Sequence, residues 1–284
     1  MKSWLAGLCC LLLAGAALAT GPAGVRKRVQ ASMLLTGTIV VAPDGSVRSY
    51  AIDHVEKVVP AAMTLINRDV PSWKFQPVLH DGKPAEVRAW MSLRVVAHPI
   101  GDEKFALDIN GSYFVVDAPG EQFSSGENEP PRYPEAAVRT RMPGTVYLVL
   151  RVDQQGRVED AAVEQVNLGA LASDRVLTKR RGEFARSALV AARKWTFHVP
   201  AAGNDRGDVE WLVRVPVVYR LLEVGEPEVD QYGKWQMYVP GPKEAVPWLD
   251  DQGLLSDSAD ALPGDGVYHL DPGGLHRIAP PSGA

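Results

Sequence analysis

The pattern that most constrains the fold is a pair of W-x-F motifs, each embedded in the same succession of predicted elements. Trp73 and Phe75 form the first motif, and Trp195 and Phe197 form the second. Each motif follows a hairpin pattern with glycine in its turn and then a helical pattern, and each precedes a turn and an alternating strand. Aromatic residues two positions apart point to the same side of a strand. All four are therefore predicted core residues that close a helix against a sheet.

The second succession is the more regular of the two. Residues 144–152 are β-branched and aliphatic, and residues 157–166 alternate after a polar turn that ends at Gly156, which is typical of a hairpin. Apolar residues at three- and four-residue spacing then predict a helix over 184–194, and alternation predicts a last strand over 209–221. These segments together predict one β-β-α-β unit.

The first succession has the same order within residues 34–97. A strand ends at Val41 before a turn with glycine, a helix is predicted over 60–69, and a strand is predicted over 87–96. Duplication of one unit is the favoured interpretation, and two unrelated β-β-α-β units are the alternative. The sequence predicts an α+β fold with two such units, each a small antiparallel sheet packed against one helix, and an irregular tail.

The rest of the chain is divided around these two units. Asn110-Gly111 is a strong turn signal and predicts a short hairpin between the units. The predicted division is a signal peptide at 1–19, an N-terminal segment at 20–33, the first unit at 34–97, a connecting region at 98–129, the second unit at 130–222 and an acidic tail rich in glycine and proline at 223–284.

The N-terminal residues have the three parts of a secretory signal peptide. Lys2 precedes an apolar stretch at 4–18, and Ala17-Leu18-Ala19 matches a cleavage site with small residues. The expected location is the periplasm, and an uncleaved anchor in the inner membrane is the alternative. Both cysteines, Cys9 and Cys10, lie in this stretch, so the cleaved chain would contain no thiol and no cysteine metal site.

Composition and motifs argue against several functional classes. A formal net charge of −4 and an isoelectric point near 5.9 do not fit a general nucleic-acid binder. No nucleophile elbow, zinc-protease motif, phosphate-binding loop or dinucleotide fingerprint is present, and the six histidines have no ligand spacing. We therefore expect no enzyme, no catalytic residue, no metal site, no cofactor and no small-molecule substrate.

Motifs over residues 130–221 resemble the C-terminal domain of the TonB energy transducers. They are Tyr133-Pro134, Gly144-Thr145-Val146, Gln155-Gly156-Arg157-Val158, Ala192-Arg193-Lys194-Trp195-Thr196-Phe197 and Arg214-Val215-Pro216-Val217. Residues 34–97 resemble the same unit as a more degenerate copy that lacks the Tyr-Pro motif. The chain departs from full transducers because it has no long proline-rich spacer, and this departure leaves coupling to the proton-motive force open.

The resemblance implies that the last strand binds an extended segment of a partner by strand addition. In the family this partner is an outer-membrane transporter, and unpaired backbone groups of an edge strand provide the contact. The corresponding residues here are Val209, Trp211, Val213, Val215, Val217 and Tyr219. Tyr133-Pro134 either flanks the partner or packs locally. The alternative for the whole edge is that the tail, for example residues 234–239, covers it.

The resulting functional hypothesis is a periplasmic TonB-like adaptor that binds an extended segment of an envelope protein, in particular an outer-membrane receptor. One alternative is a membrane-anchored energy transducer for receptor-dependent transport, which requires an uncleaved N-terminus. Another is a structural envelope protein whose strand edges pair with each other in a homodimer.

Overall fold

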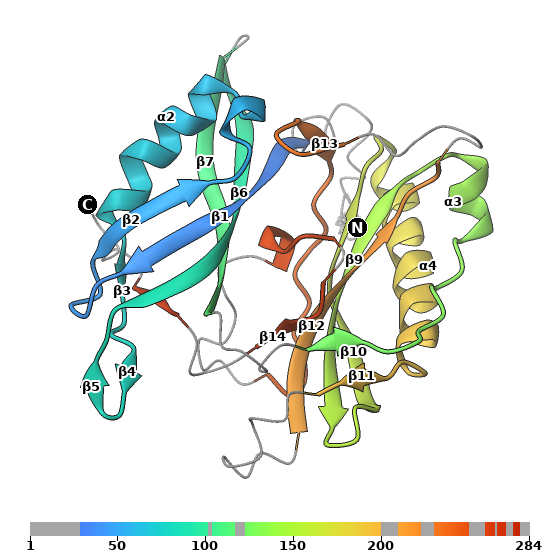
Figure 1. Ribbon diagram of the computed structural model, residues 1–284. Helices are drawn as coiled ribbons and strands as arrows, with labels where there is room; N and C mark the ends of the chain where they lie inside the picture. Colours follow the sequence, from blue (N-terminus) through green and yellow to red (C-terminus); the bar gives the residue numbers. More distant parts are fainter. Residues whose placement is uncertain are drawn as a thin grey trace, which may run out of the picture.

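A computed structural model of the chain describes residues 29–101, 104–116, 123–199, 210–222, 230–249, 259–264, 266–270 and 275–278. The predicted signal peptide at 1–19 lies outside these ranges. The described chain has an α+β fold with small antiparallel sheets, as predicted. Two sheets stand opposite each other, each has one long helix on its outer side, and the C-terminal tail runs between them (Figure 1).

The first sheet is built from four long strands in the order β2–β1–β6–β7. They are β1 (Gln30–Val41), β2 (Val47–Ile52), β6 (Val87–Gly101) and β7 (Lys104–Val116), and the short β13 (Gln236–Tyr238) lies beside the start of β1. Helix α2 (Pro60–Asp69) covers one face, and its boundaries match the predicted helix at 60–69. Pro60 suits the first helical position, and Ala62, Leu65 and Ile66 turn towards the sheet.

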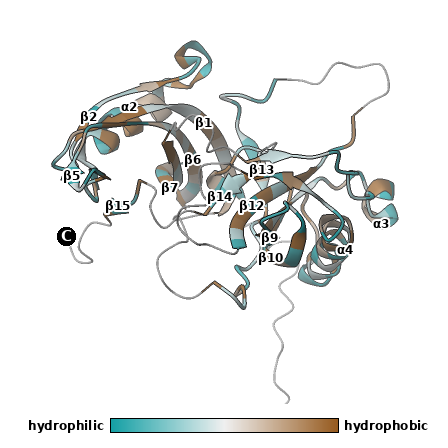
Figure 2. Cartoon of the chain, turned by 60° about the horizontal axis from the view of Figure 1, so that its bottom comes forward, coloured by the Kyte–Doolittle hydropathy of each residue, from teal (hydrophilic) through white to brown (hydrophobic). Residues whose placement is uncertain are grey.

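The second sheet has the order β10–β9–β12–β14. Its strands are β9 (Gly144–Asp153), β10 (Val158–Leu168), β12 (Glu210–Tyr219) and β14 (Tyr268–His269). Helix α4 (Asp174–Ala192) covers its outer face with Leu177, Phe184 and Ala188, all fully buried. Figure 2 shows hydrophobic residues along the strands of the two sheets. Both helices therefore bury one apolar stripe against a sheet.

Short elements complete the chain. They are η1 (Val55–Lys57), η2 (Val70–Ser72), β3 (Lys74–Phe75), β4 (Leu79–His80), β5 (Lys83–Pro84), β8 (Ser124–Ser125), α3 (Glu135–Arg139), β11 (Phe197–His198), η4 (Ala259–Ala261) and β15 (Arg277–Ile278).

The predicted hairpin around Asn110-Gly111 is wrong, because both residues lie within strand β7. The residues on both sides of this pair belong to one strand, which pairs with β6 along its length. Arg94 pairs with Gly111 and Val95 with Ile109, so Asn110 is the extra residue of a bulge. A continuous ladder with β6 satisfies more backbone groups than an isolated two-stranded hairpin would, and it uses the Asn-Gly pair as a bulge.

The two W-x-F motifs are attached to their hairpins in the same way. Gly45 and Gly156 each have a φ of 78°, and their carbonyls accept hydrogen bonds from the amides of Phe75 at 2.8 Å and Phe197 at 2.7 Å. A Cβ on either glycine would overlap the carbonyl oxygen of that phenylalanine. A side chain is therefore excluded at both positions by the left-handed conformation and by lack of space.

The four aromatic residues of these motifs differ in burial. Phe75, Trp195 and Phe197 are buried, and the indole nitrogen of Trp195 donates to the Glu129 carbonyl at 3.0 Å. Trp73 is half-buried and lies beneath the guanidinium of Arg277, 4.8 Å from its ring centre. The second motif thus closes a more complete core than the first.

The tail joins the two sheets. Strand β13 pairs with β1, β14 with β12, and β15 with β3. The Val239 backbone forms two hydrogen bonds with Leu168 of β10, which extends the same contact to the second sheet. A tail that pairs with both sheets holds them as layers on either side of it.

Polar side chains line the space between the sheets. Arg94 donates from Nε to the Asp260 carbonyl at 2.6 Å and from Nη1 to the Ser32 hydroxyl at 3.2 Å. The Tyr238 hydroxyl donates to the carboxylate of Asp260 at 2.9 Å. Burial raises the pKa of Tyr147 to about 12, against a smaller opposing effect of the Arg94 charge. The buried hydroxyl of Tyr147 therefore stays protonated well into the alkaline range.

This buried phenol predicts a loss of stability in alkali. The folded-state pKa of Tyr147 lies above the ordinary value of 10, so its contribution is complete below pH 10 and is lost as the pH rises towards 12. The expected loss is roughly 1.4 kcal/mol per pH unit in this window. Guanidinium unfolding between pH 9 and pH 12 measures it, and Tyr147→Phe should reduce the slope by about this amount. Burial also raises the pKa of Tyr238, so part of the slope should remain. An unchanged slope in this variant would assign the alkaline loss to other groups.

Candidate functional site

The outer edge of β12 is the first candidate site, and one hydrogen bond fixes which of its residues face outward. The Leu270 amide donates to the Leu212 carbonyl at 2.8 Å, on the side of β12 opposite β9. Backbone groups alternate along a strand, so Leu212, Arg214, Pro216 and Val218 direct their backbone groups to this edge. Pro216 has no amide hydrogen, and it sits where no bond to β9 is lost.

The predicted partner-binding residues of this strand alternate with the outward ones. Trp211, Val213, Val215, Val217 and Tyr219 are each at most 8% exposed, and their side chains belong to the core under α4. The sixth predicted residue, Val209, lies outside the described residues. A strand added at this edge would therefore bond to the backbone of β12. The five predicted side chains would stay in the core under α4.

A short part of the tail lies against this edge. His269 is opposite Val213 and Tyr268 is opposite Arg214 in antiparallel register. The clip is defined here as residues 266–270 together with Gly264, where a built Cβ would lie 2.5 Å from Cγ2 of Val218. Only two register pairs of the clip belong to the ladder, so most of the length of β12 has no strand partner on this side among the described residues.

The sequence left open, as an alternative, that residues 234–239 of the tail cover this edge, and the structure places these residues elsewhere. These residues pair with β1 of the first sheet and with Leu168 of β10, at the far edge of the second sheet. The tail does cover part of β12, but with the clip instead. Sequence periodicity could not distinguish these arrangements because both segments are short and irregular.

Tyr133 packs locally within the second unit. Its ring lies 5.7 Å from that of Phe184 and 5.5 Å from that of Tyr219, and its hydroxyl donates to the Met142 carbonyl at 2.8 Å. Pro134 is the residue before helix α3 and has an extended backbone. The Tyr-Pro motif thus closes the end of the core near Tyr219.

A buried ion pair underlies the clip. The Arg214 guanidinium donates two hydrogen bonds to the Glu164 carboxylate, at 2.7 and 3.0 Å, and the side chains are 0% and 5% exposed. The pair crosses the face of the second sheet that is turned away from α4, where Val149, Val246 and Leu270 form a small apolar cluster. Alternation along β12 would place Arg214 in solvent, so the sequence alone gave no sign of this pair.

The opposite edge of the second sheet is held by another part of the tail. The Glu244 amide donates to the Glu164 carbonyl at 2.7 Å, and the Gln165 side chain donates to the Gly241 carbonyl at 2.8 Å. Arg181 of α4 donates to the carbonyls of Val166, Val239 and Pro240, at 3.1 to 3.3 Å. The edge of β10 is therefore filled by the chain itself.

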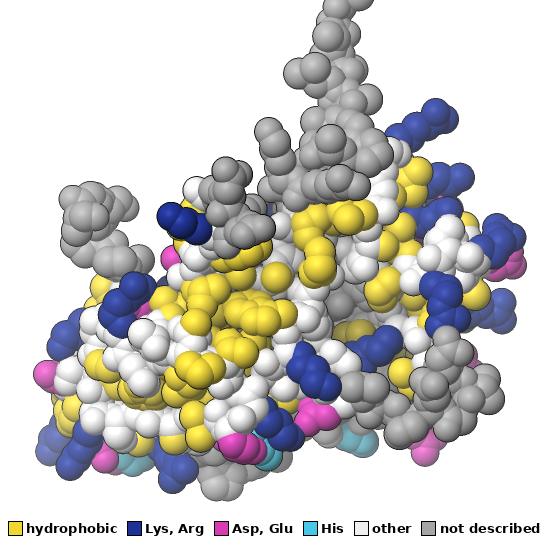
Figure 3. All heavy atoms as spheres, turned by 90° about the horizontal axis from the view of Figure 1, so that it is seen from above, with side chains coloured by type: hydrophobic (Ala, Val, Ile, Leu, Met, Phe, Trp, Pro, Cys, Tyr) yellow, Lys and Arg dark blue, Asp and Glu magenta, His cyan; other side chains and the backbone are white. Residues whose placement is uncertain are grey.

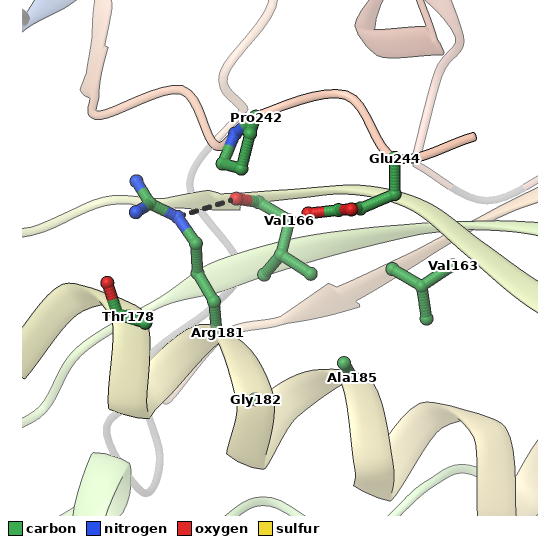
Figure 4. A pocket seen from close by; sticks show the side chains of 8 residues that line it. All are labelled: Val163, Val166, Thr178, Arg181, Gly182, Ala185, Pro242 and Glu244. Atoms are coloured by element: carbon green, nitrogen blue, oxygen red, sulfur yellow. Dashed lines mark hydrogen bonds between the residues drawn. The ribbon is translucent and has the colours of Figure 1, made fainter.

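A pocket of about 270 Å³ lies beside this contact, between α4, β10 and the tail (Figure 4). It is lined by Val163, Val166, Thr178, Arg181, Gly182, Ala185, Pro242 and Glu244. Its floor is apolar, and Figure 4 shows the Arg181 side chain bonded to the Val166 carbonyl. The guanidinium thus serves to hold the tail.

The hairpin of β6 and β7 projects from the first sheet (Figure 1). Ile100 and Phe105 near its tip are more than 60% exposed, as is Met237 of β13. Seen from above, hydrophobic side chains gather over the first sheet and the middle of the molecule (Figure 3). Among the described residues, β7 pairs only with β6, so its outer edge has no strand partner there.

The described residues contain no group of three or more His, Cys, Asp or Glu side chains that could hold a metal ion. Within the same ranges, no helix has both the length and the apolar character needed to cross a bilayer.

The second sheet and α4 form a small α+β unit in which antiparallel strands pack against one helix. Over 98 residues the chain is 34% identical to Protein TonB of Xanthomonas campestris pv. campestris, in strains B100 and ATCC 33913. The match covers 34% of this chain and 38% of that protein, so the chain spans well under half the length of these relatives. The chain thus carries a TonB-like segment. No protein-family model and no solved structure matches it.

Proposed function

We propose that this protein is a TonB-like adaptor of the bacterial cell envelope that binds an extended segment of a partner protein by strand addition at β12. The partner fits an outer-membrane receptor, and the protein has no catalytic role. The similarity to Protein TonB over 98 residues supports the class. The proposed site rests on one observation, the outward backbone groups of β12, which meet a ladder of two register pairs within the described part of the chain.

Strand addition suits the physical character of this edge. An added strand gains backbone hydrogen bonds in both directions, and side chains beside the edge supply selectivity. Pro216 removes one donor but keeps its carbonyl, and Val218 beyond it is 36% exposed. A partner segment therefore has outward groups on both sides of the proline.

The periplasm remains the proposed location, with a cleaved N-terminus. The similarity to Protein TonB also keeps an anchored transducer as the second candidate. The mass of the native protein after separation of soluble and membrane fractions distinguishes them. A soluble species that begins at Thr20 supports the adaptor, and a full-length species in the inner membrane supports the transducer.

The edge predicts which proline substitution removes partner binding. Val218→Pro deletes an outward amide of β12 and leaves the ladder with β9 intact, so capture of the partner from envelope extracts should fall at least tenfold. Val190→Ser, at an exposed position of α4, is the matched control and should leave capture unchanged. Equal capture by native protein and folded Val218→Pro would refute the proposed edge.

Val213→Pro does not provide this test. The amide of Val213 faces β9, because its neighbour Leu212 faces outward. Proline at this position would break the ladder inside the sheet, and a loss of capture would then report unfolding.

A further inference from the structure

We propose that the clip is an intramolecular ligand that occupies the docking edge of β12 until a partner segment of similar chemistry displaces it. This inference rests on the proposed function and adds the regulation of the site and the kind of segment that it takes. It concerns residues of the tail that lie outside the TonB-like unit.

In the first sheet, a complete strand pairs with the edge that corresponds to the outer edge of β12. Both sheets have a hairpin followed by a third strand beside its first strand, in the orders β2–β1–β6 and β10–β9–β12. In the first sheet β7 fills the edge beyond the third strand with twelve register pairs. In the second sheet the same edge has the clip with two pairs. The first edge is closed by a permanent strand, and the second is closed by a short segment.

Besides its pairing with β12, the clip is held by an apolar contact, by a hydrogen bond from the first sheet and by ring contacts of Tyr268 and His269. Leu270 is 4% exposed and packs with Val149 and Val246, and the Tyr113 hydroxyl donates to the His269 carbonyl at 3.0 Å. The His269 ring lies 5.3 Å from the Trp211 ring. A competing strand that made more ladder bonds along β12 could replace these contacts, because backbone pairing adds with length.

The clip also indicates the chemistry of its competitor. It runs antiparallel to β12, places apolar Leu270 in a buried cluster and brings Gly264 against Val218. A partner segment that uses the same contacts is extended, carries an apolar residue at one end and has a small residue at the other. The segment Leu262–Leu270 of the chain itself, with the sequence LPGDGVYHL, is therefore a suitable probe.

The structure allows the clip to be locked reversibly. A Cβ placed on Gly264 lies 3.7 Å from the Cβ of Val218, which is within the usual range of a disulfide. The double variant Val218→Cys with Gly264→Cys, made with Cys9 and Cys10 replaced by serine, has no other thiol. Oxidation should hold the clip on the edge, and reduction should release it.

The test measures binding of the labelled LPGDGVYHL peptide to the full chain. We expect the reduced double variant to bind at least ten times more tightly than the oxidised form. Leu270→Asp places a charge in the apolar cluster and should release the clip, so it should bind the peptide at least ten times more tightly than the native chain. Circular dichroism and hydrogen exchange of the tail check the fold and the release.

The contrary results separate the two proposals. Equal affinity of the native chain and Leu270→Asp, with the oxidised form blocked, would keep the docking edge but overturn the role of the clip. Peptide binding to the oxidised and reduced forms alike would overturn the clip as a competitor. Absence of binding to every form, with the clip released in Leu270→Asp, would overturn the docking edge and the clip together.

Discussion

Arg214→Ala should destabilise the protein by about 3–5 kcal/mol, because it leaves the Glu164 carboxylate buried without its cation. Both side chains are at most 5% exposed, and the two hydrogen bonds between them are charge-assisted. Glu164→Ala should cost a similar amount for the same reason. The free energy of unfolding, from guanidinium titration followed by circular dichroism, measures both effects.

An apolar replacement of the whole pair is the matched control. The double variant Glu164→Leu with Arg214→Met removes both charges and keeps much of the volume, so it should be far more stable than either single variant. Single variants that lose less than about 1 kcal/mol would contradict the buried pair, since exposed ion pairs have effects of that size.

Gly156→Ala should destabilise the second unit by about 3 kcal/mol or more. The left-handed backbone of Gly156 disfavours any side chain, and the new Cβ would also overlap the carbonyl oxygen of Phe197. Gly45→Ala should have the same effect in the first unit, where the carbonyl of Phe75 occupies the equivalent place. Denaturant unfolding measures the two losses.

Substitutions at two other glycines distinguish the cost of a left-handed backbone from the cost of steric overlap. Gly82 has a φ of 74° with no atom within 4 Å of a built Cβ, so Gly82→Ala should cost only about 1 kcal/mol. Gly182 lies in helix α4 with the same free space, and Gly182→Ala should stabilise the protein by about 0.5–1 kcal/mol. Equal effects of Gly156→Ala and Gly82→Ala would contradict the proposed overlap with Phe197.

The sequence predicted the parts of the fold whose periodicity is local. Helix α2 matches its predicted range, because Pro60 marks its start and the apolar spacing is regular. Helix α4 begins at Asp174, ten residues before the predicted start, because the cationic residues 179–181 obscure its apolar stripe. The outer strand β7 was predicted as a hairpin, because the Asn110-Gly111 signal is local and the competing ladder with β6 is not.

The candidate site depends on contacts that no local pattern contains. Arg214 alternates with valines as an exposed strand residue would, and its burial follows from the tail that packs over the sheet. The clip is joined to β12 from more than fifty residues further along the chain, through two ladder pairs. That β12 pairs with a partner stays a prediction of the sequence. Which of its backbone groups face outward could be assigned only from the hydrogen bond between Leu270 and Leu212.

The central claim is that the edge of β12 binds an extended segment of an envelope protein. The most direct measurement replaces Val218 with a photo-reactive amino acid in the producing bacterium and maps the cross-linked product by mass spectrometry. Val190 on α4, which is 56% exposed, is the control position. The account predicts a product at 218, and not at 190, that joins this edge to a short segment of an outer-membrane protein. Products at 218 that contain only the tail of the chain itself, or that match those at 190, would contradict it.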